Sequence, residues 1–279
     1  MAFKKFLRKI GFWLGMLFFA AFAVFPTVWM LISSFKENND LYNVANNPFL
    51  FNLPPTLKHV KFLFTDTDFS MFLWNSVLIG VMVVIITLLL AVPAAYSLSR
   101  LVGRWGERSG IAVFLVYLIP PTLLFIPLYQ VMSLVHAANT IWALVLVYPT
   151  ITVPFCTWLL LGFFKAMPRE MEEAALIDGY SRWQAFLRVS LPMAWPGVAT
   201  CVVFAFALSL SDYIYAASFV SETASRPLNS GVPTALMRGD IYFWQSLMAA
   251  AAIVTIPLAI GYGLLFDKLI QGFQPEAKN

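Results

Sequence analysis

The chain has 279 residues, of which 60% are hydrophobic and only 11% charged, and its formal net charge is +4. A soluble domain has roughly 45–50% apolar and about 25% charged residues, so the composition excludes an ordinary soluble enzyme and a disordered protein. Five stretches of 23 to 56 residues contain no charged residue at all. Because a membrane-spanning helix needs about 20 apolar residues, and the 56-residue stretch has room for two, we predict an all-α membrane protein with six transmembrane helices.

The predicted spans follow one another closely and leave no room for a large soluble domain, so residues 1–279 are expected to form one transmembrane domain. In chain order the spans cover residues of about 11–34, 72–98, 109–134, 140–163, 194–217 and 245–267. The first apolar run is longer than the core of a secretory signal peptide, so we expect it to be retained as a helix. Prolines recur inside the spans and predict bent helices packed around a pathway, although membrane helices also tolerate proline generally.

Positively charged residues lie mostly on one side of the predicted spans. The N-terminus, residues 99–110, residues 165–193 and the C-terminus together hold 13 Lys and Arg residues, whereas the alternate loops hold five. Cytoplasmic loops carry the excess of Lys and Arg. We therefore expect both termini and residues 165–193 to lie in the cytoplasm. Since the basic charge follows membrane topology, no nucleic-acid partner is expected.

Residues 165–193 form a polar segment between the fourth and fifth spans. Pro168 suits the first position of a helix, and Gly179 suits the left-handed position that ends one. Ser181 and Gln184 have the spacing of a capping box for a second helix, which is expected to stop before Pro192. The segment is thus predicted to be two short cytoplasmic helices. An amphipathic loop lying on the lipid headgroups is the alternative interpretation.

The same segment contains a motif of fixed spacing. It reads Glu173-Ala174-Ala175, three residues, Gly179, nine residues and then Val189-Ser190-Leu191-Pro192. This resembles the EAA loop of bacterial ABC importer permeases, in which Ile stands where this chain has Val189. The six-span layout and Ser211-Asp212-Tyr213 are similar to the carbohydrate-uptake permeases of the maltose-transporter MalG type. We call residues 165–193 the coupling loop.

The resemblance implies a transporter subunit of the bacterial inner membrane that has no catalytic site. Two ATPase subunits in the cytoplasm would bind ATP and Mg, and a second, homologous permease subunit would complete the pathway. A periplasmic or lipoprotein solute-binding protein would deliver a sugar or sugar derivative. The sequence agrees, because it has no Gly-x4-Gly-Lys-Ser/Thr motif to hold ATP phosphates. We expect neither a cofactor nor a metal on this chain.

In the family, the EAA helix docks in a cleft of an ATPase subunit, so the resemblance implies a set of ATPase-coupling residues. They are Glu173, Ala174, Ala175, Asp178, Gly179, Leu191 and Pro192. The two alanines are small enough to enter a cleft. We expect steric fit to matter more than charge, because an exposed ion pair contributes only about 0–1 kcal/mol.

Polar side chains within the spans are candidates for contact with a sugar. They are Asp212, Tyr213, Tyr117, Gln130 and Asn75. An ionisable group at the edge of a span is a functional candidate by default, but Asp212 is equally consistent with a helix-end residue in interfacial water. Tyrosines can bond sugar hydroxyls, and they also anchor spans at the membrane interface.

A stand-alone secondary transporter or channel is the alternative function. Such transporters commonly have paired repeats, broken helices and buried charges, and the sequence shows neither a clear repeat nor charges buried in the spans. The EAA-like motif also has no purpose without an ATPase. A subunit of an ATP-driven sugar importer is therefore the function that the sequence favours.

Overall fold

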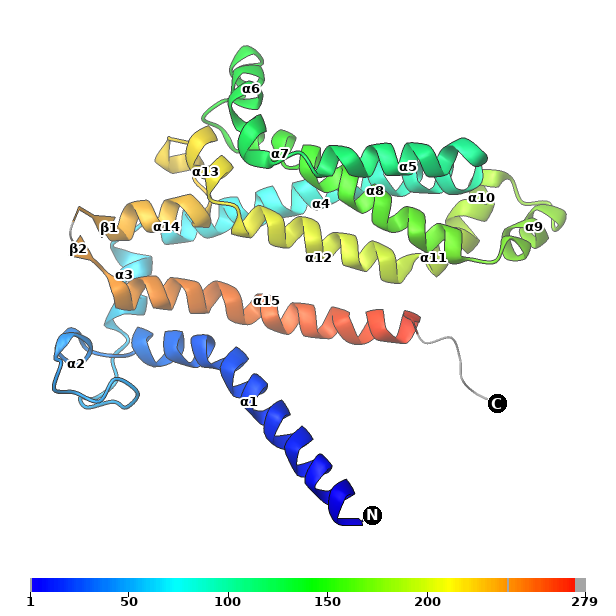
Figure 1. The fold of residues 1–279 in the computed structure, drawn as a ribbon. Coiled ribbons are helices and arrows are strands. Elements are labelled where there is room, and N and C mark those ends of the chain that lie inside the picture. The colour runs from blue at the N-terminus through cyan, green and yellow to red at the C-terminus, as the bar shows by residue number, and fades with distance from the viewer. Residues whose placement is uncertain (1, 240, 274–279) are drawn as a thin grey trace. The chain divides into compact units, whose positions relative to one another are not determined.

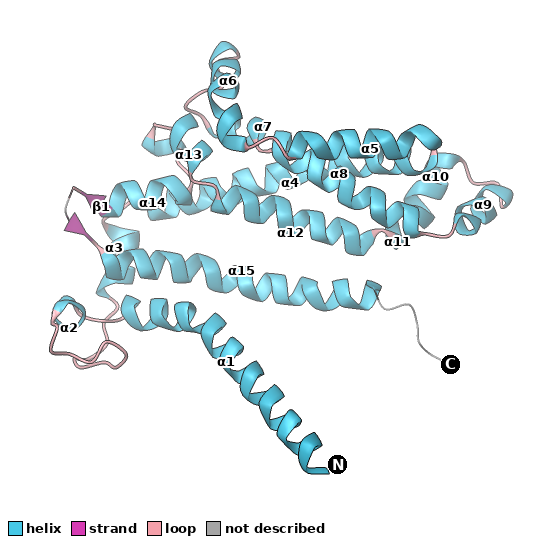
Figure 2. Cartoon of the chain, viewed as in Figure 1, coloured by secondary structure: helices cyan, strands magenta, loops and turns pink. Residues whose placement is uncertain are grey.

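The computed structural model describes residues 2–239 and 241–273 (Figure 1). The chain forms two compact units, one made of Met1–Asp68 with Val232–Ala259 and the other of Phe69–Gly231 with Ile260–Asn279. Helices make up most of the described residues, which also include two short strands (Figure 2). The C-terminal tail, residues 274–279, is predicted to be cytoplasmic and lies outside the described residues.

The helices are long and apolar enough to cross a membrane. Four segments qualify alone, namely Arg8–Ser34, Phe69–Arg100, Ile141–Ala166 and Trp244–Gly263. Two further segments are bent pairs, with 86° between Arg108–Tyr117 and Pro121–Leu134 and 73° between Arg182–Met193 and Trp195–Ser211. Counting each bent pair as one span gives six within the described part of the chain. The all-α membrane fold is confirmed, and the cytoplasmic location of the termini stays a prediction.

The first unit contains the predicted first span and most of the last. Its elements are α1 (Ala2–Ser34), α2 (Asn38–Tyr42), α3 (Lys58–Thr65), β1 (Met237–Arg238), β2 (Ile241–Tyr242) and the first part of α15 (Trp244–Phe273). The strands pair antiparallel, with Met237 opposite Tyr242. The rings of Phe62 in α3 and Phe243, just before α15, stack with their centroids 5.3 Å apart.

A buried ion pair organises the loop that follows α1. Lys36 Nζ lies 3.5 Å from Asp40 Oδ1, and neither side chain is exposed. Asn52 donates its side-chain amide to Asp40 Oδ1 (2.7 Å) and its backbone N–H to Oδ2 (3.0 Å). Burial alone would raise the pKa of the Asp40 carboxyl, but the hydrogen bonds from Asn52 and the charge of Lys36 outweigh it and lower the pKa.

The lowered pKa of Asp40 predicts how the loop responds to acid. An ionised Asp40 stabilises the loop fully above the carboxyl's ordinary pKa, and this contribution is lost as the pH falls through the lowered value. We expect amide-exchange protection of residues 36–53 to hold above about pH 4 and to fall below it. At neutral pH, Asp40→Asn should accelerate exchange about tenfold or more, because it strands the buried Lys36 charge. Glu37→Gln removes the acid of the exposed pair with Lys58 and is the control, and equal protection in both variants would contradict this account.

The second unit contains the remaining helices. They are α4 (Phe69–Arg100), α5 (Arg104–Tyr117), α6 (Pro121–Leu134), α7 (Ile141–Val147), α8 (Pro149–Ala166), α9 (Arg169–Ile177), α10 (Arg182–Ala185), the π-helical turn η1 (Phe186–Ser190), α11 (Leu191–Met193), α12 (Trp195–Ser211), α13 (Ile214–Phe219), the 3-10 turn η2 (Thr223–Ser225) and the start of α14 (Leu228–Leu236). The long helices α4, α8 and α12 pack along one another, and α5 packs on α8 (Figure 1).

Small residues allow this close packing. Ala91 and Ala95 in α4 lie in one apolar core with Leu160 in α8 and Cys201 in α12. The hydroxyls of Thr87 and Thr152 bond each other across α4 and α8 at 2.6 Å, so neither polar group is left unpaired. A Cβ at Gly110 in α5 would lie 2.2 Å from a methyl group of Leu161 in α8. Glycine at this position therefore lets α5 approach α8.

Two predicted spans differ from the helices that form. Span 109–134 is divided between α5 and α6, because Pro120 and Pro121 follow each other and a residue before proline avoids the helical region. Span 194–217 is interrupted after Ser211, where Asp212 is extended before α13 begins. Spans 72–98, 140–163 and 245–267 correspond to α4, α7 with α8, and α15.

Candidate functional site

The coupling loop contains the predicted pair of helices. α9 spans Arg169–Ile177, and Gly179 follows with a φ of +90°. The N–H of Gly179 bonds the Leu176 carbonyl (3.1 Å), and the N–H of Tyr180 bonds the Ala175 carbonyl (3.0 Å). These two bonds form a Schellman motif, which requires a left-handed residue. The predicted role of Gly179 at the helix end is confirmed, whereas Pro168 precedes the helix as its N-cap instead of occupying the first helical position.

The second helix begins as predicted but does not end as predicted. Gln184 accepts from the Ser181 N–H (2.8 Å), and the Gln184 N–H donates to Ser181 Oγ (3.3 Å), which completes the capping box. The expectation that this helix stops before Pro192 was wrong, because it continues through η1 and α11 to Met193. The π turn is wider than an α turn. It ends at Ser190, and Pro192 lies in the first turn of α11, where a missing N–H is tolerated.

The two faces of α9 have different environments. Glu173, Ala174 and Ile177 are exposed, and Ile177 retains 86% of its accessible surface. Ala175 is only 6% exposed because it faces the interior of this chain. Ala175 therefore does not share the exposed face of Ala174, and the prediction that it enters an ATPase cleft stays a prediction without support from its position. Sequence reasoning missed Ile177, although it lies three residues after Ala174 on the same face.

The buried face of α9 carries a charged residue. The Tyr96 hydroxyl donates to Glu172 Oε1 (2.5 Å), and Ser190 Oγ donates to Glu172 Oε2 (3.2 Å). Arg100 Nε lies 3.5 Å from Glu172 Oε2, with the two side chains 7% and 12% exposed. Removing one member of such a buried pair typically costs about 3–5 kcal/mol. Glu172 therefore anchors α9 to the end of α4 and to η1.

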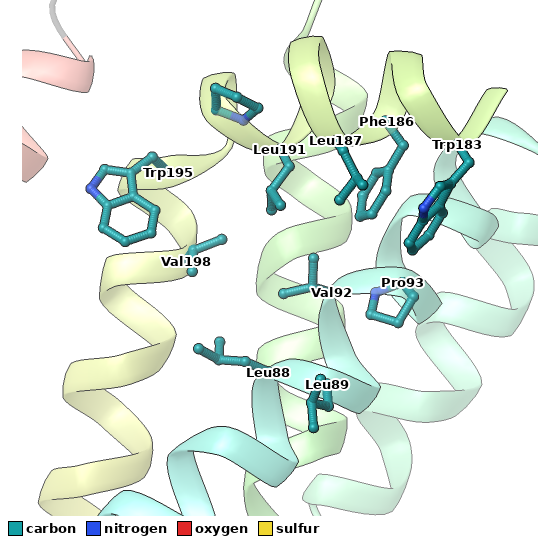
Figure 3. Close-up of a pocket in the computed structure, with 11 residues that line it drawn as sticks. Leu88, Leu89, Val92, Pro93, Trp183, Phe186, Leu187, Leu191, Trp195 and Val198 are labelled. Atoms are coloured by element: carbon teal, nitrogen blue, oxygen red, sulfur yellow. The ribbon is translucent and has the colours of Figure 1, made fainter. Parts of the chain in front are cut away.

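An apolar pocket of about 760 Å³ lies beneath α10, η1 and α11, between α4 and α12 (Figure 3). Its lining residues are Leu88, Leu89, Val92, Pro93, Trp183, Phe186, Leu187, Leu191, Pro192, Trp195 and Val198. The predicted coupling residues Leu191 and Pro192 are thus wall residues of this pocket. Since sugar sites need polar groups to bond hydroxyls, this lining excludes the pocket as a sugar site.

Asp212 lies at the break between α12 and α13. Its Oδ2 accepts from the Tyr148 hydroxyl (3.1 Å) and from the backbone N–H of Tyr215 (3.0 Å). The Tyr215 hydroxyl donates to the carbonyl of Pro121 (2.6 Å), at the start of α6. These bonds connect the breaks in the two interrupted spans. Asp212 is therefore hydrogen-bonded within the chain, and its role in a substrate pathway stays a prediction. The role of Tyr213, which is exposed, also stays a prediction.

The remaining pathway candidates lie in separate surroundings. Asn75 is buried and donates to the carbonyls of Ala224 (2.9 Å) and Arg226 (3.0 Å), which ties α4 to the loop before α14. Tyr117 packs its ring against Phe155 at 5.1 Å. Gln130 lines a partly polar pocket of about 620 Å³ on α6 and the turn after it. Within the described residues, no hydrogen bond or ring contact joins these three to one another or to Asp212.

Comparison with known proteins places this architecture in a family. Residues 69–274 match the family described as binding-protein-dependent transport system inner membrane component. The chain is 32% identical over 250 residues to the sulfoquinovosyl glycerol transport system permease protein SmoH of Agrobacterium fabrum, covering 89% of this chain and 86% of SmoH. It is 29% identical over 270 residues to the trehalose/maltose transport system permease protein MalG of Thermococcus litoralis, covering 96% and 95%.

The fold is also found among solved structures. A chain of a bacterial ABC transporter involved in the import of the acidic polysaccharide alginate superposes with a TM-score of 0.78 at 19% identity, covering 93% of this chain and 96% of that chain. The family match includes the coupling loop and both interrupted spans. The chain therefore belongs to the inner membrane components of binding-protein-dependent transport systems.

Proposed function

We propose that this chain is the permease subunit of an ATP-driven sugar importer, and that an ATPase subunit docks on the exposed face of α9. The observation that carries the proposal is the division of α9 into two faces. Glu173, Ala174 and Ile177 face outward, while Glu172 and Ala175 fix the helix to the rest of the chain. Helix α9 is thus held firmly to the rest of the chain and still exposes one face. An ATPase subunit that binds this face can transmit its movement to the spans.

The substrate class follows from the relatives. Their names specify sulfoquinovosyl glycerol and trehalose/maltose, so a sugar or sugar derivative is the cargo that we propose. A solute-binding protein delivers it on the outer side of a bacterial inner membrane, and a second, homologous permease completes the pathway. Two ATPase subunits bind ATP and Mg, because this chain has no phosphate-binding motif of its own.

A stand-alone transporter or channel is the weaker proposal. Membership of a binding-protein-dependent family argues against a chain that works alone. The interrupted spans suit either class, but a rigid cytoplasmic helix with an exposed apolar residue does not serve a stand-alone pore. The coupling loop thus favours the multisubunit importer.

Docking on α9 depends more on shape than on charge. An exposed pair involving Glu173 contributes only about 0–1 kcal/mol. Complete burial of a side chain the size of Ile177 contributes about 1.5–3 kcal/mol, and Ala174 adds a surface with almost no side chain. Asp178 and Gly179 form the tight turn that ends α9 at the edge of this docking face. A partner can therefore surround the end of the helix.

The reversal at Gly179 provides the first test. Gly179→Val forces a β-branched residue to a positive φ and so distorts the end of α9. We expect ATPase co-purification to fall about tenfold and sugar-stimulated ATP hydrolysis to be lost. The control is Gly162→Ala in α8, where an added Cβ meets open space. Stimulation at the wild-type level in Gly179→Val would show that this loop is not the coupling element.

The apolar residue on the docking face provides the second test. Ile177→Ser should weaken ATPase binding about 10- to 100-fold, measured by titrating ATPase subunits onto the purified permease pair. Ile177→Val keeps most of the apolar surface and serves as the matched control, with a loss of less than about fivefold. An unchanged affinity in the serine variant would remove Ile177 from the interface.

The substrate role of Asp212 provides the third test. Asp212→Asn keeps the side-chain size and removes the carboxylate charge, so uptake should slow about tenfold while the complex still assembles, if Asp212 contacts sugar hydroxyls. Tyr148→Phe removes the internal hydrogen bond to Asp212 and keeps the Asp212 carboxylate, so it is the control. If Tyr148→Phe slows uptake as much as Asp212→Asn, Asp212 acts through the helix break and not through the sugar.

A further inference from the structure

We infer that Glu172 is a positioning residue that transmits the displacement of α9 to α4, an inference that rests on the proposed docking of an ATPase on the opposite face. Its carboxylate is enclosed where α4, α9 and η1 meet. Both of its oxygens are bonded or paired within this chain, so we do not expect the group to contact an ATPase. Its contacts instead lead inward to the second predicted span.

The carboxylate of Glu172 is held from two elements at once. Oε1 accepts from Tyr96 in α4, whereas Oε2 accepts from Ser190 at the end of η1 and lies 3.5 Å from Arg100 Nε. Arg100 also donates its Nη2 to the Met167 carbonyl at 3.0 Å, just before α9 begins. A shift of α9 relative to α4 would leave a buried charge without its partner, so the two elements are expected to move together.

The Tyr96 ring is fixed in turn by its neighbours. It packs against Phe164 of α8, with ring centroids 5.7 Å apart, and against Phe186 of η1 at 4.5 Å. These ring contacts hold the Tyr96 side chain in place, so its hydroxyl points at Glu172 in a fixed orientation. At the other end of α4, Asn75 bonds the carbonyls of Ala224 and Arg226. Helix α4 thus links the coupling loop to the loop before α14.

The sharpest test removes the hydroxyl of Tyr96 and leaves its ring in place. Tyr96→Phe and Glu172→Gln are compared with Tyr180→Phe, an exposed tyrosine of the same loop. Each permease is assembled with its ATPase, second permease and binding protein in liposomes. Three quantities are measured: the ATPase subunits that co-purify, the ATP hydrolysed with loaded binding protein, and the sugar transported per ATP.

We expect Tyr96→Phe to retain the ATPase subunits and to hydrolyse ATP, while sugar transported per ATP falls about fivefold or more. Glu172→Gln also leaves Arg100 without its ion-pair partner, so it should lower the ratio at least as much. Tyr180→Phe should keep the wild-type ratio. A wild-type ratio in Tyr96→Phe would overturn the inference. Loss of the ATPase subunits from Tyr96→Phe would also overturn it, because the cluster would then only shape the docking face.

The two proposals fail in different ways. If the wild-type permease does not retain ATPase subunits at all, the proposed docking function fails. If it retains them, and Gly179→Val releases them while Tyr96→Phe keeps full transport per ATP, only the role of Glu172 fails. Should Glu172→Gln not fold, Tyr96→Phe still decides the question, because it deletes one hydroxyl and preserves the aromatic packing.

Discussion

Enclosure of two opposite charges at the C-terminal end of α4 is the constraint on which the coupling loop depends. Glu172 and Arg100 are almost excluded from water, and burying charges is costly unless they are paired and hydrogen-bonded. The hydrogen bonds and the ion pair of the Glu172 carboxylate fix the rotation of α9 about its own axis. That rotation decides which residues of the helix face outward. The docking face of Glu173, Ala174 and Ile177 is thus a consequence of what lies on the inner side of the helix.

The interrupted spans obey a related constraint on backbone groups. In a bilayer, carbonyls and amides released by a break must find partners within the protein. The structure supplies them through side chains, since the Tyr215 hydroxyl bonds the Pro121 carbonyl and Asp212 accepts from the Tyr215 N–H. One tyrosine therefore stabilises breaks in two helices.

Polar and apolar surfaces are separated along the second unit. Beneath α10, η1 and α11, the pocket is lined by apolar side chains, whereas the hydrogen-bonding groups of Asp212, Tyr148 and Asn229 gather at the end of α12. Sugars bind through hydroxyls, so the second region is chemically suited to a pathway and the first is not.

The sequence by itself determined the all-α membrane fold and the two short helices of the coupling loop, because these depend on local composition and spacing. Gly179, Ser181 and Gln184 adopt the predicted cap conformations for the same reason. Only the tertiary structure decided that Ala175 is buried and that Glu172 pairs with Arg100, which lies 72 residues earlier. Local pattern says where a helix begins and ends, but the face that it turns inward is set by contacts between residues far apart in the chain.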